Sequence, residues 1–195
     1  DSFDVETEYC FGFGRSYTEF ELKAGEISVN GNEVQVPVEV KNIGSKYAGK
    51  EVVQVYYSAI GGEIDKPYQE LAAYKKTKLL APGESEQLVL TYPVSQMASY
   101  SEKEAAWVLE RGEYVIRVGN SSASTVAAGV AEVKESVKTV IAKNLFALDV
   151  ELEEIRPDAG KLAAKKQASV GADVKRVVVD TAAIPTQTVV YQGER

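Results

Sequence analysis

Short segments in which apolar and polar residues alternate constrain the fold of this chain more than any other feature. The clearest segment runs from Glu33 to Lys41, with valine at every even position and mostly polar residues between. A period of two is typical of a strand with one buried and one solvated face. Asn30-Gly31 before it is a favoured hairpin signal. Pro37 has no N–H to donate, so it predicts an edge position or a bulge.

Similar alternating segments follow in succession. They are Glu51–Ser58, Leu71–Leu79, Leu88–Tyr92, Trp107–Leu109, Tyr114–Val118 and Val126–Val130. The stretches between them are rich in residues that favour turns. We expect a loop at Ala59–Pro67 and a short helical turn within Val94–Glu104. Many short strands without a long helix predict an all-β protein, an antiparallel sandwich.

Charge and composition exclude two classes of partner. The net charge of −7 comes from residues 1–130, which hold 19 acidic and 12 basic side chains, whereas residues 131–195 hold 10 of each. Nucleic acid is not expected as a partner, since binding it requires a basic face. No apolar run approaches the roughly 20 residues of a membrane span, so no membrane partner is expected either.

The cysteine content and the N-terminus bear on the origin of the chain. Cys10 is the only cysteine, which excludes an internal disulfide bond. Because the N-terminus also does not resemble a signal peptide, a bacterial cytoplasmic location is favoured. The sequence does not begin with methionine, and we expect it to be a piece of a longer protein.

The C-terminal residues have a weaker pattern. Apolar residues within Leu145–Ile155 fit both helical and alternating spacing, and we expect largely extended chain with at most one helical turn, ended by Pro157. Ala159–Gln167 is small and basic, which suits a linker. Val177–Val179 and Thr188–Tyr191 are predicted strands that lie against a neighbouring surface.

A series of short motifs occurs in one order along the first two thirds of the chain. They are Phe11–Phe20, Val40–Gly44, Ala48–Tyr56, Lys66–Leu71, Leu80–Ser85, Trp107 with Gly112–Tyr114, and Val118–Ser122. This set resembles the fibronectin type III-like domain of glycoside hydrolase family three, the β-glucosidase family. Each motif is weak alone, but their order over about residues 9–123 is specific.

The resemblance implies a fold and a division of the chain. An immunoglobulin- or fibronectin type III-like sandwich is expected at residues 16–133. Residues 1–15 would then lead in from an upstream domain, and residues 134–195 would form a largely extended connector toward a downstream domain. That connector departs from the commonest family layout and is similar to the one in permuted bacterial members.

The resemblance also implies a function. In that family, the two catalytic carboxylates lie on a barrel-type domain and an α/β-sandwich domain, and neither of their motifs occurs here. A non-catalytic accessory domain without cofactor or metal is therefore expected, with those two domains of the same parent chain as partners. Its loop Ala59–Pro67 is a candidate to border the substrate entrance, near bound β-glucosides.

Four aromatic residues near the N-terminus are candidates for interdomain docking, namely Phe11, Phe13, Tyr17 and Phe20. Their large apolar areas require a partner surface. Gly12 and Gly14 between them permit close approach of the backbone. We expect these rings to divide between the sandwich and an upstream domain.

No group of residues forms a convincing catalytic set. The absence of histidine excludes histidine-based triads and histidine metal ligands. Cys10 therefore lacks a histidine partner, and a half-buried structural thiol is favoured over a nucleophile. Glu151, Glu153 and Glu154 form the densest carboxylate cluster, for which a solvated face is favoured over a glycosidase pair.

The aromatic residues leave a second function open, that of a stand-alone carbohydrate-binding or adhesive module. The candidates for sugar stacking are Tyr56, Tyr57, Tyr68, Tyr74, Tyr92, Tyr100 and Trp107. We favour core and interface packing, with Trp107 and Tyr114 in the core or at a sheet corner. Asn120-Ser121-Ser122 matches a glycosylation acceptor, but a turn after a strand is favoured. A secreted surface protein with the same sandwich is a third possibility.

Overall fold

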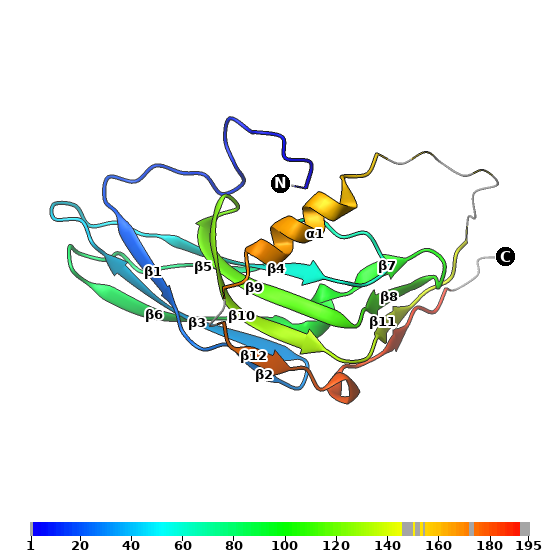
Figure 1. Ribbon diagram of the computed structural model, residues 1–195. Coiled ribbons are helices and arrows are strands. Elements are labelled where there is room, and N and C mark those ends of the chain that lie inside the picture. Colours follow the sequence, from blue (N-terminus) through cyan, green and yellow to red (C-terminus); the bar gives the residue numbers. More distant parts are fainter. Residues whose placement is uncertain (1, 146–149, 151–152, 154, 172–173, 192–195) are drawn as a thin grey trace.

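The computed structural model describes residues 2–145, 150, 153, 155–171 and 174–191, and consists of packed β-sheets with one helix on an outer face (Figure 1). One sheet holds β1 (Phe20–Ala24), β3 (Glu33–Asn42), β2 (Ser28–Asn30) and β6 (Ser85–Pro93). The second has the order β12 (Arg176–Val178), β10 (Ser124–Val133), β9 (Gly112–Ser121), β4 (Val52–Ile60), β5 (Glu70–Lys76). A smaller third sheet holds β13 (Gln187–Thr188), β11 (Val137–Ile141), β8 (Ala106–Leu109) and β7 (Ser99–Ser101).

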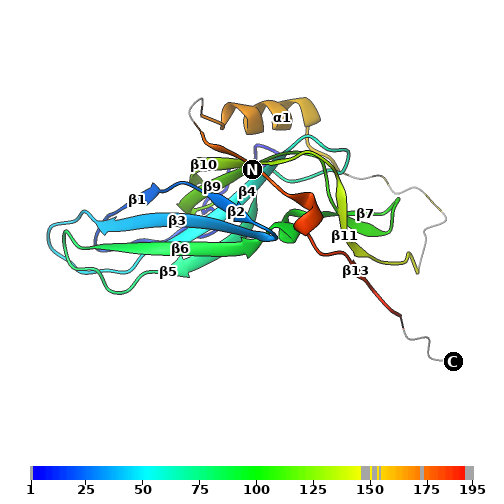
Figure 2. The ribbon, with the colours of Figure 1, turned by 90° about the horizontal axis from the view of Figure 1, so that it is seen from below.

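The alternating segments form the two main layers of the sandwich. On β3, all four valines of the even positions are fully buried. They share one core cluster with Val53, Val55 and Tyr57 of β4 and with Tyr114, Ile116 and Val118 of β9. Figure 2 shows the layer of β3 and β6 beside the layer of β4, β9 and β10. The predicted all-β sandwich is thus confirmed.

Pro37 lies in an interior strand, so its predicted edge position is wrong. β3 pairs with β6 on one side, where Pro37 lies opposite Val89, and with β1 and β2 on the other. The ladder on that other side is interrupted, because β1 ends at Ala24 and β2 begins at Ser28. The Pro37 carbonyl accepts a hydrogen bond from the N–H of Gly25 within this gap, at 2.8 Å. The missing N–H of Pro37 therefore faces a break in the ladder.

The C-terminal residues add one helix and two parallel strands. The predicted strands at 177–179 and 188–191 appear as β12 and the short β13, which pair in parallel with β10 and β11 of this chain. The predicted linker at Ala159–Gln167 is wrong, because α1 spans Ala159–Ala168. The Asp158 side chain caps this helix by accepting from the Lys161 N–H at 2.9 Å. Most of Leu145–Ile155 lies outside the described residues.

The remaining elements are short. Two 3-10 turns, η1 (Val94–Met97) and η2 (Thr181–Ala183), complete the described elements, and η1 confirms the predicted helical turn after β6. The strands β7 and β11 were not predicted from the sequence. None of the helices in the described ranges is long and apolar enough to cross a membrane. Helix α1 and the N-terminal segment lie on the same side of the molecule, over β4 and β9 (Figure 1).

Candidate interaction site

The outer face of the second sheet is covered by other parts of the chain rather than by solvent. Gln54, Tyr56 and Ser58 of β4 and Arg117 of β9 have the parity that points away from the core, yet all are at least nine-tenths buried. The N-terminal segment, the chain after Pro67 and α1 lie over this face. The segment before β1 contains three of the four predicted docking residues, and the chain after Pro67 continues directly from the predicted loop.

A turn fixes the N-terminal segment at Phe11. The N–H of Phe13 donates to the Cys10 carbonyl at 3.0 Å, and the N–H of Ser122 donates to the Phe11 carbonyl at 2.9 Å. Between them, Gly12 adopts a φ of +80°, and a Cβ atom there would lie 2.4 Å from Nε2 of Gln54. Only glycine adopts this conformation without strain and leaves this space free.

Replacing Gly12 with alanine is expected to loosen this turn by about 1–2 kcal/mol, because alanine is strained at positive φ and its methyl group displaces the Gln54 side chain. Hydrogen exchange at the Ser122 N–H measures the effect, since this group is bonded to Phe11. Gly14→Ala is the matched control, because nothing lies within 4 Å of a Cβ atom there. Equal exchange in both variants would contradict the prediction.

A second anchor holds the segment at Thr18. The Thr18 hydroxyl donates to Oδ1 of Asn42 at 2.6 Å, and Asn42 is fully buried. Nδ2 of Asn42 donates to the carbonyls of Tyr47 and Leu80, both at 2.9 Å, while Oδ1 also accepts from the Gly44 N–H at 3.1 Å. Asn42 at the end of β3 thus holds Thr18, two residues before β1 begins.

The predicted docking residues fall into two groups. Phe11, Phe13 and Tyr17 are 66%, 51% and 92% exposed, although the segment that carries them is anchored on both sides. Phe20, in β1, packs against the sandwich core. Sequence reasoning missed Tyr9, whose ring centroid lies 5.0 Å from that of Phe13, and Tyr47, which lies 6.2 Å from Tyr17. Tyr9 adjoins the predicted motif and could have been included on that basis, but Tyr47 is distant in sequence.

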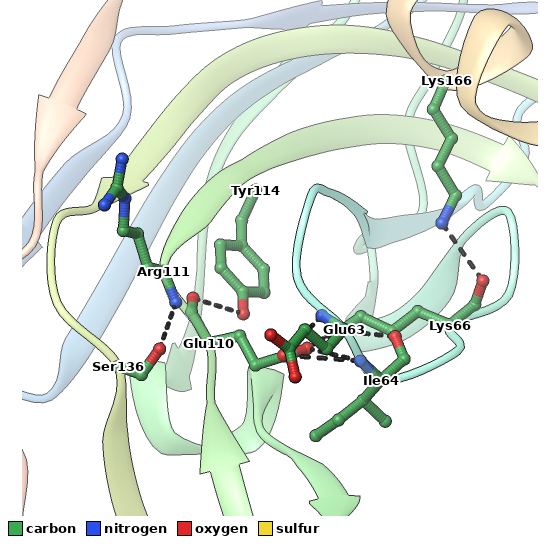
Figure 3. A network of polar contacts seen from close by, with 8 residues as sticks. All are labelled: Glu63, Ile64, Lys66, Glu110, Arg111, Tyr114, Ser136 and Lys166. Atoms are coloured by element: carbon green, nitrogen blue, oxygen red, sulfur yellow. Dashed lines mark hydrogen bonds and ion pairs between the residues drawn. The ribbon is translucent and has the colours of Figure 1, made fainter.

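The first two residues of the predicted loop Ala59–Pro67 belong to β4, and the remainder of the loop is held by the carboxylate of Glu110 (Figure 3). Oε1 of Glu110 accepts from the N–H of Glu63 at 2.7 Å, and Oε2 accepts from the N–H of Ile64 at 3.2 Å. Lys66 forms an ion pair with the same carboxylate and donates to the Ile64 carbonyl at 3.0 Å. The Tyr114 hydroxyl donates to the Glu110 carbonyl at 3.0 Å, which fixes the backbone at that residue.

Burial and hydrogen bonding act in opposite directions on Glu110. Burial raises the pKa of its carboxyl, but the hydrogen bonds from Lys66 and the Glu63 N–H outweigh burial, so the pKa lies below its usual range. The side chains of Lys66 and Glu110 are only 3% and 11% exposed. The loop therefore contains a buried, charged pair that keeps its shape at neutral pH.

A polar hollow of about 750 Å³ adjoins this loop. Glu63 and Asp65 line it from the loop, Tyr100 and Glu102 line it from β7 and the turn after it, and Arg111 lies on a further wall. Asp65 is paired with Arg156 at 3.2 Å. Among the residues that the structure describes, no three His, Cys, Asp or Glu side chains are grouped so as to hold a metal ion.

The other candidate residues are dispersed. Cys10 is half-buried and its pKa is lowered, first by the hydroxyl of Ser121, which lies at the end of β9. Of the predicted carboxylate cluster, only Glu153 belongs to the described residues. Trp107 is 46% exposed on β8, so of its two predicted positions, in the core or at a sheet corner, the core position is wrong. Its ring pairs with Tyr100 at 5.8 Å, whereas Tyr114 is buried as predicted.

Comparison with known proteins agrees with this architecture. Residues 51–122 match the family model of the fibronectin type III-like domain. Thermostable β-glucosidase B of Acetivibrio thermocellus is 34% identical over 172 residues, which cover 84% of this chain and 22% of that protein.

Solved structures give the same result. β-Glucosidase 3B of Thermotoga neapolitana, in complex with glucose, is 47% identical with a TM-score of 0.65, over 71% of this chain and 19% of that one. The GH3 β-glucosidase of Bifidobacterium adolescentis is 28% identical with a TM-score of 0.65, over 76% of this chain and 22% of that one. The chain thus spans about a fifth of the length of these relatives. The sandwich in this chain is a fibronectin type III-like domain of the kind that β-glucosidases of glycoside hydrolase family three contain.

Proposed function

We propose that this chain is a non-catalytic accessory part of a β-glucosidase-like glycoside hydrolase, and that it braces the α/β-sandwich and barrel-type catalytic domains of its parent protein. The observation that carries the proposal is the exposure of Phe11, Phe13 and Tyr17 on a segment anchored at Phe11 and Thr18. Exposed apolar rings at fixed positions are typical of a surface that packs against another domain.

Residues 1–15 are proposed as the lead-in from an upstream domain, residues 16–133 as the sandwich, and residues 134–195 as the connector toward a downstream domain. The loop Ala59–Pro67 is proposed to border the substrate entrance. Its support is the rigidity that Glu110 gives it, together with the polar hollow beside it.

The chain alone is expected not to hydrolyse an aryl β-glucoside. Retaining glycosidases need two carboxyl groups about 5 Å apart across a sugar site, one of them with a raised pKa. Release of the aryl group by the purified chain, compared with an identically purified preparation from cells that lack the chain, measures this directly. Turnover above that of the control preparation would overturn the proposal.

One observation supports a second candidate function, that of a carbohydrate-binding module. Trp107 and Tyr100 present two partly exposed rings side by side, and aromatic faces of this kind stack on sugar rings. Calorimetric titration with cello-oligosaccharides separates the two functions. Saturable binding by the chain that is lost in Trp107→Ala would favour the binding module, and its absence favours the accessory role.

A further inference from the structure

Two cations from different elements lie over the ring of Tyr68. The guanidinium of Arg117, on β9, lies 5.4 Å from the ring centroid, and the ammonium of Lys165, on α1, lies 4.9 Å from it. The backbone N–H of Tyr68 donates to the hydroxyl of Ser2 at 2.8 Å. Tyr68, which directly follows the loop, therefore contacts the second sheet, the helix and the N-terminal segment.

On the sheet side, the ring compensates a buried charge. Nε and Nη2 of Arg117 donate to the hydroxyl and the carbonyl of Thr125 at 2.9 and 3.2 Å. Within the described part of the chain, Nη1 of Arg117 is buried without a hydrogen-bond partner. A cation that has lost solvent is stabilised by an aromatic face. The next residue, Gln69, also holds this part of the chain on the second sheet. Its side chain accepts from the Thr125 hydroxyl at 3.2 Å and donates to the Ser122 carbonyl at 2.5 Å.

On the helix side, α1 holds both the loop and the N-terminal segment. Lys165 pairs with Asp4 at 2.6 Å, in addition to its contact with Tyr68. The buried ammonium of Lys166 donates to the Lys66 carbonyl at 3.1 Å, as Figure 3 shows. Ahead of the helix, the ion pair of Arg156 with Asp65 adds a contact to the loop.

We propose that Tyr68 is a positioning residue that locks the N-terminal segment, the loop Ala59–Pro67 and α1 into one unit on the outer face of the second sheet. Each of these segments contacts Tyr68 or its immediate neighbours, and each also contacts another of the three. Given the accessory role proposed above, on which this last step rests, the lock fixes the direction in which the chain enters the domain relative to the direction in which it leaves.

Hydrogen exchange on the full chain tests the lock, read at the Phe13 and Ser122 N–H groups, whose bonds hold the N-terminal segment, and at α1. Tyr68→Ala is expected to raise exchange in both segments about tenfold, while β3, β4 and β9 stay protected. Tyr68→Phe keeps the ring and is expected to match the unmodified chain. Tyr74→Ala, at a ring 72% exposed on β5, is the control and is expected to change neither segment.

Two results would overturn the proposal. One is exchange that rises only next to residue 68, and the other is exchange that rises in only one of the two segments. If Tyr68→Ala does not fold, Lys165→Met replaces it, because this change removes the helix-side cation and leaves the ring in place. Lys165→Met is expected to raise exchange in both segments to a smaller extent, and exchange confined to α1 would contradict the lock. The measurement involves no partner domain and no sugar, so its outcome is independent of the accessory role.

Discussion

Replacing Asn42 with alanine is expected to lower the free energy of unfolding by about 3 kcal/mol, through the loss of a side chain that forms four hydrogen bonds at the end of β3. Asn42 is fully buried, and so is Leu80, whose carbonyl is left without its donor away from water. The carbonyl of Tyr47 and the hydroxyl of Thr18 each lose the bond described above. Urea unfolding of the full chain measures the change.

Two further variants separate the hydrogen bonds from general effects of substitution. Asn42→Asp keeps the size of the side chain but cannot donate to the two carbonyls, and it is expected to cost at least as much as alanine. Gln87→Ala removes an exposed amide on β6 and is expected to stay within about 0.5 kcal/mol of the unmodified chain. If Asn42→Ala were no more destabilising than Gln87→Ala, the assigned network would be wrong.

Replacing Glu110 with alanine is expected to cost about 3–5 kcal/mol, since it removes one partner of a buried ion pair. The ammonium of Lys66 then stays buried without its carboxylate, and the N–H groups of Glu63 and Ile64 lose their acceptor. Glu21→Ala, which breaks the exposed pair of Glu21 with Lys23, is the control and is expected to cost less than about 1 kcal/mol. Equal costs for the two variants would contradict the assigned role of the pair.

The stabilisation by Glu110 also has an expected pH dependence. Its pKa is lower in the folded chain than the ordinary value of 4.5, so the unfolded state binds more protons between the two values. The stabilisation is thus fully present above about pH 4.5 and is lost as the pH falls through the folded value. The difference in unfolding free energy between the unmodified chain and Glu110→Ala should narrow over that acid range, and a constant difference would contradict the assigned pKa.

The sandwich could be predicted from the sequence because its information is local. The alternating valines of β3 and the alternating apolar residues of β4 and β9 each indicate a strand with one buried face. The turn residues indicate where these strands end. Pro37 shows the limit of this reasoning. An interior strand tolerates proline only where the neighbouring ladder is broken, and the break between Ala24 and Ser28 depends on two other strands.

The candidate site could be predicted only in part, because its contacts join distant segments. The exposed rings of Phe11, Phe13 and Tyr17 were found from their density in sequence. The ion pair of Lys66 with Glu110 and the contact of Lys165 with Tyr68 have no local signature. Likewise, small and basic residues such as those of Ala159–Gln167 suit a linker, but alanine, lysine and glutamine also favour helix, and α1 forms there.

The most direct measurement of the accessory role is an exchange of domains in a known relative. The fibronectin type III-like domain of Thermotoga neapolitana β-glucosidase 3B, 47% identical in sequence, would be replaced with the sandwich of this chain and its N-terminal segment. Phe11→Ser, Phe13→Ser and Tyr17→Ser together are expected to lower the melting temperature of the hybrid enzyme by several degrees. The same changes in the isolated chain should cost less than about 1 kcal/mol, because the rings are exposed there.

The control hybrid carries Tyr74→Ser and Val126→Ser, which remove equally exposed apolar side chains on β5 and β10. We expect this control to have the same melting temperature as the unmodified hybrid, and only the triple variant to melt at a lower temperature. A triple variant that melts and hydrolyses β-glucoside as the control does would contradict docking through the N-terminal rings.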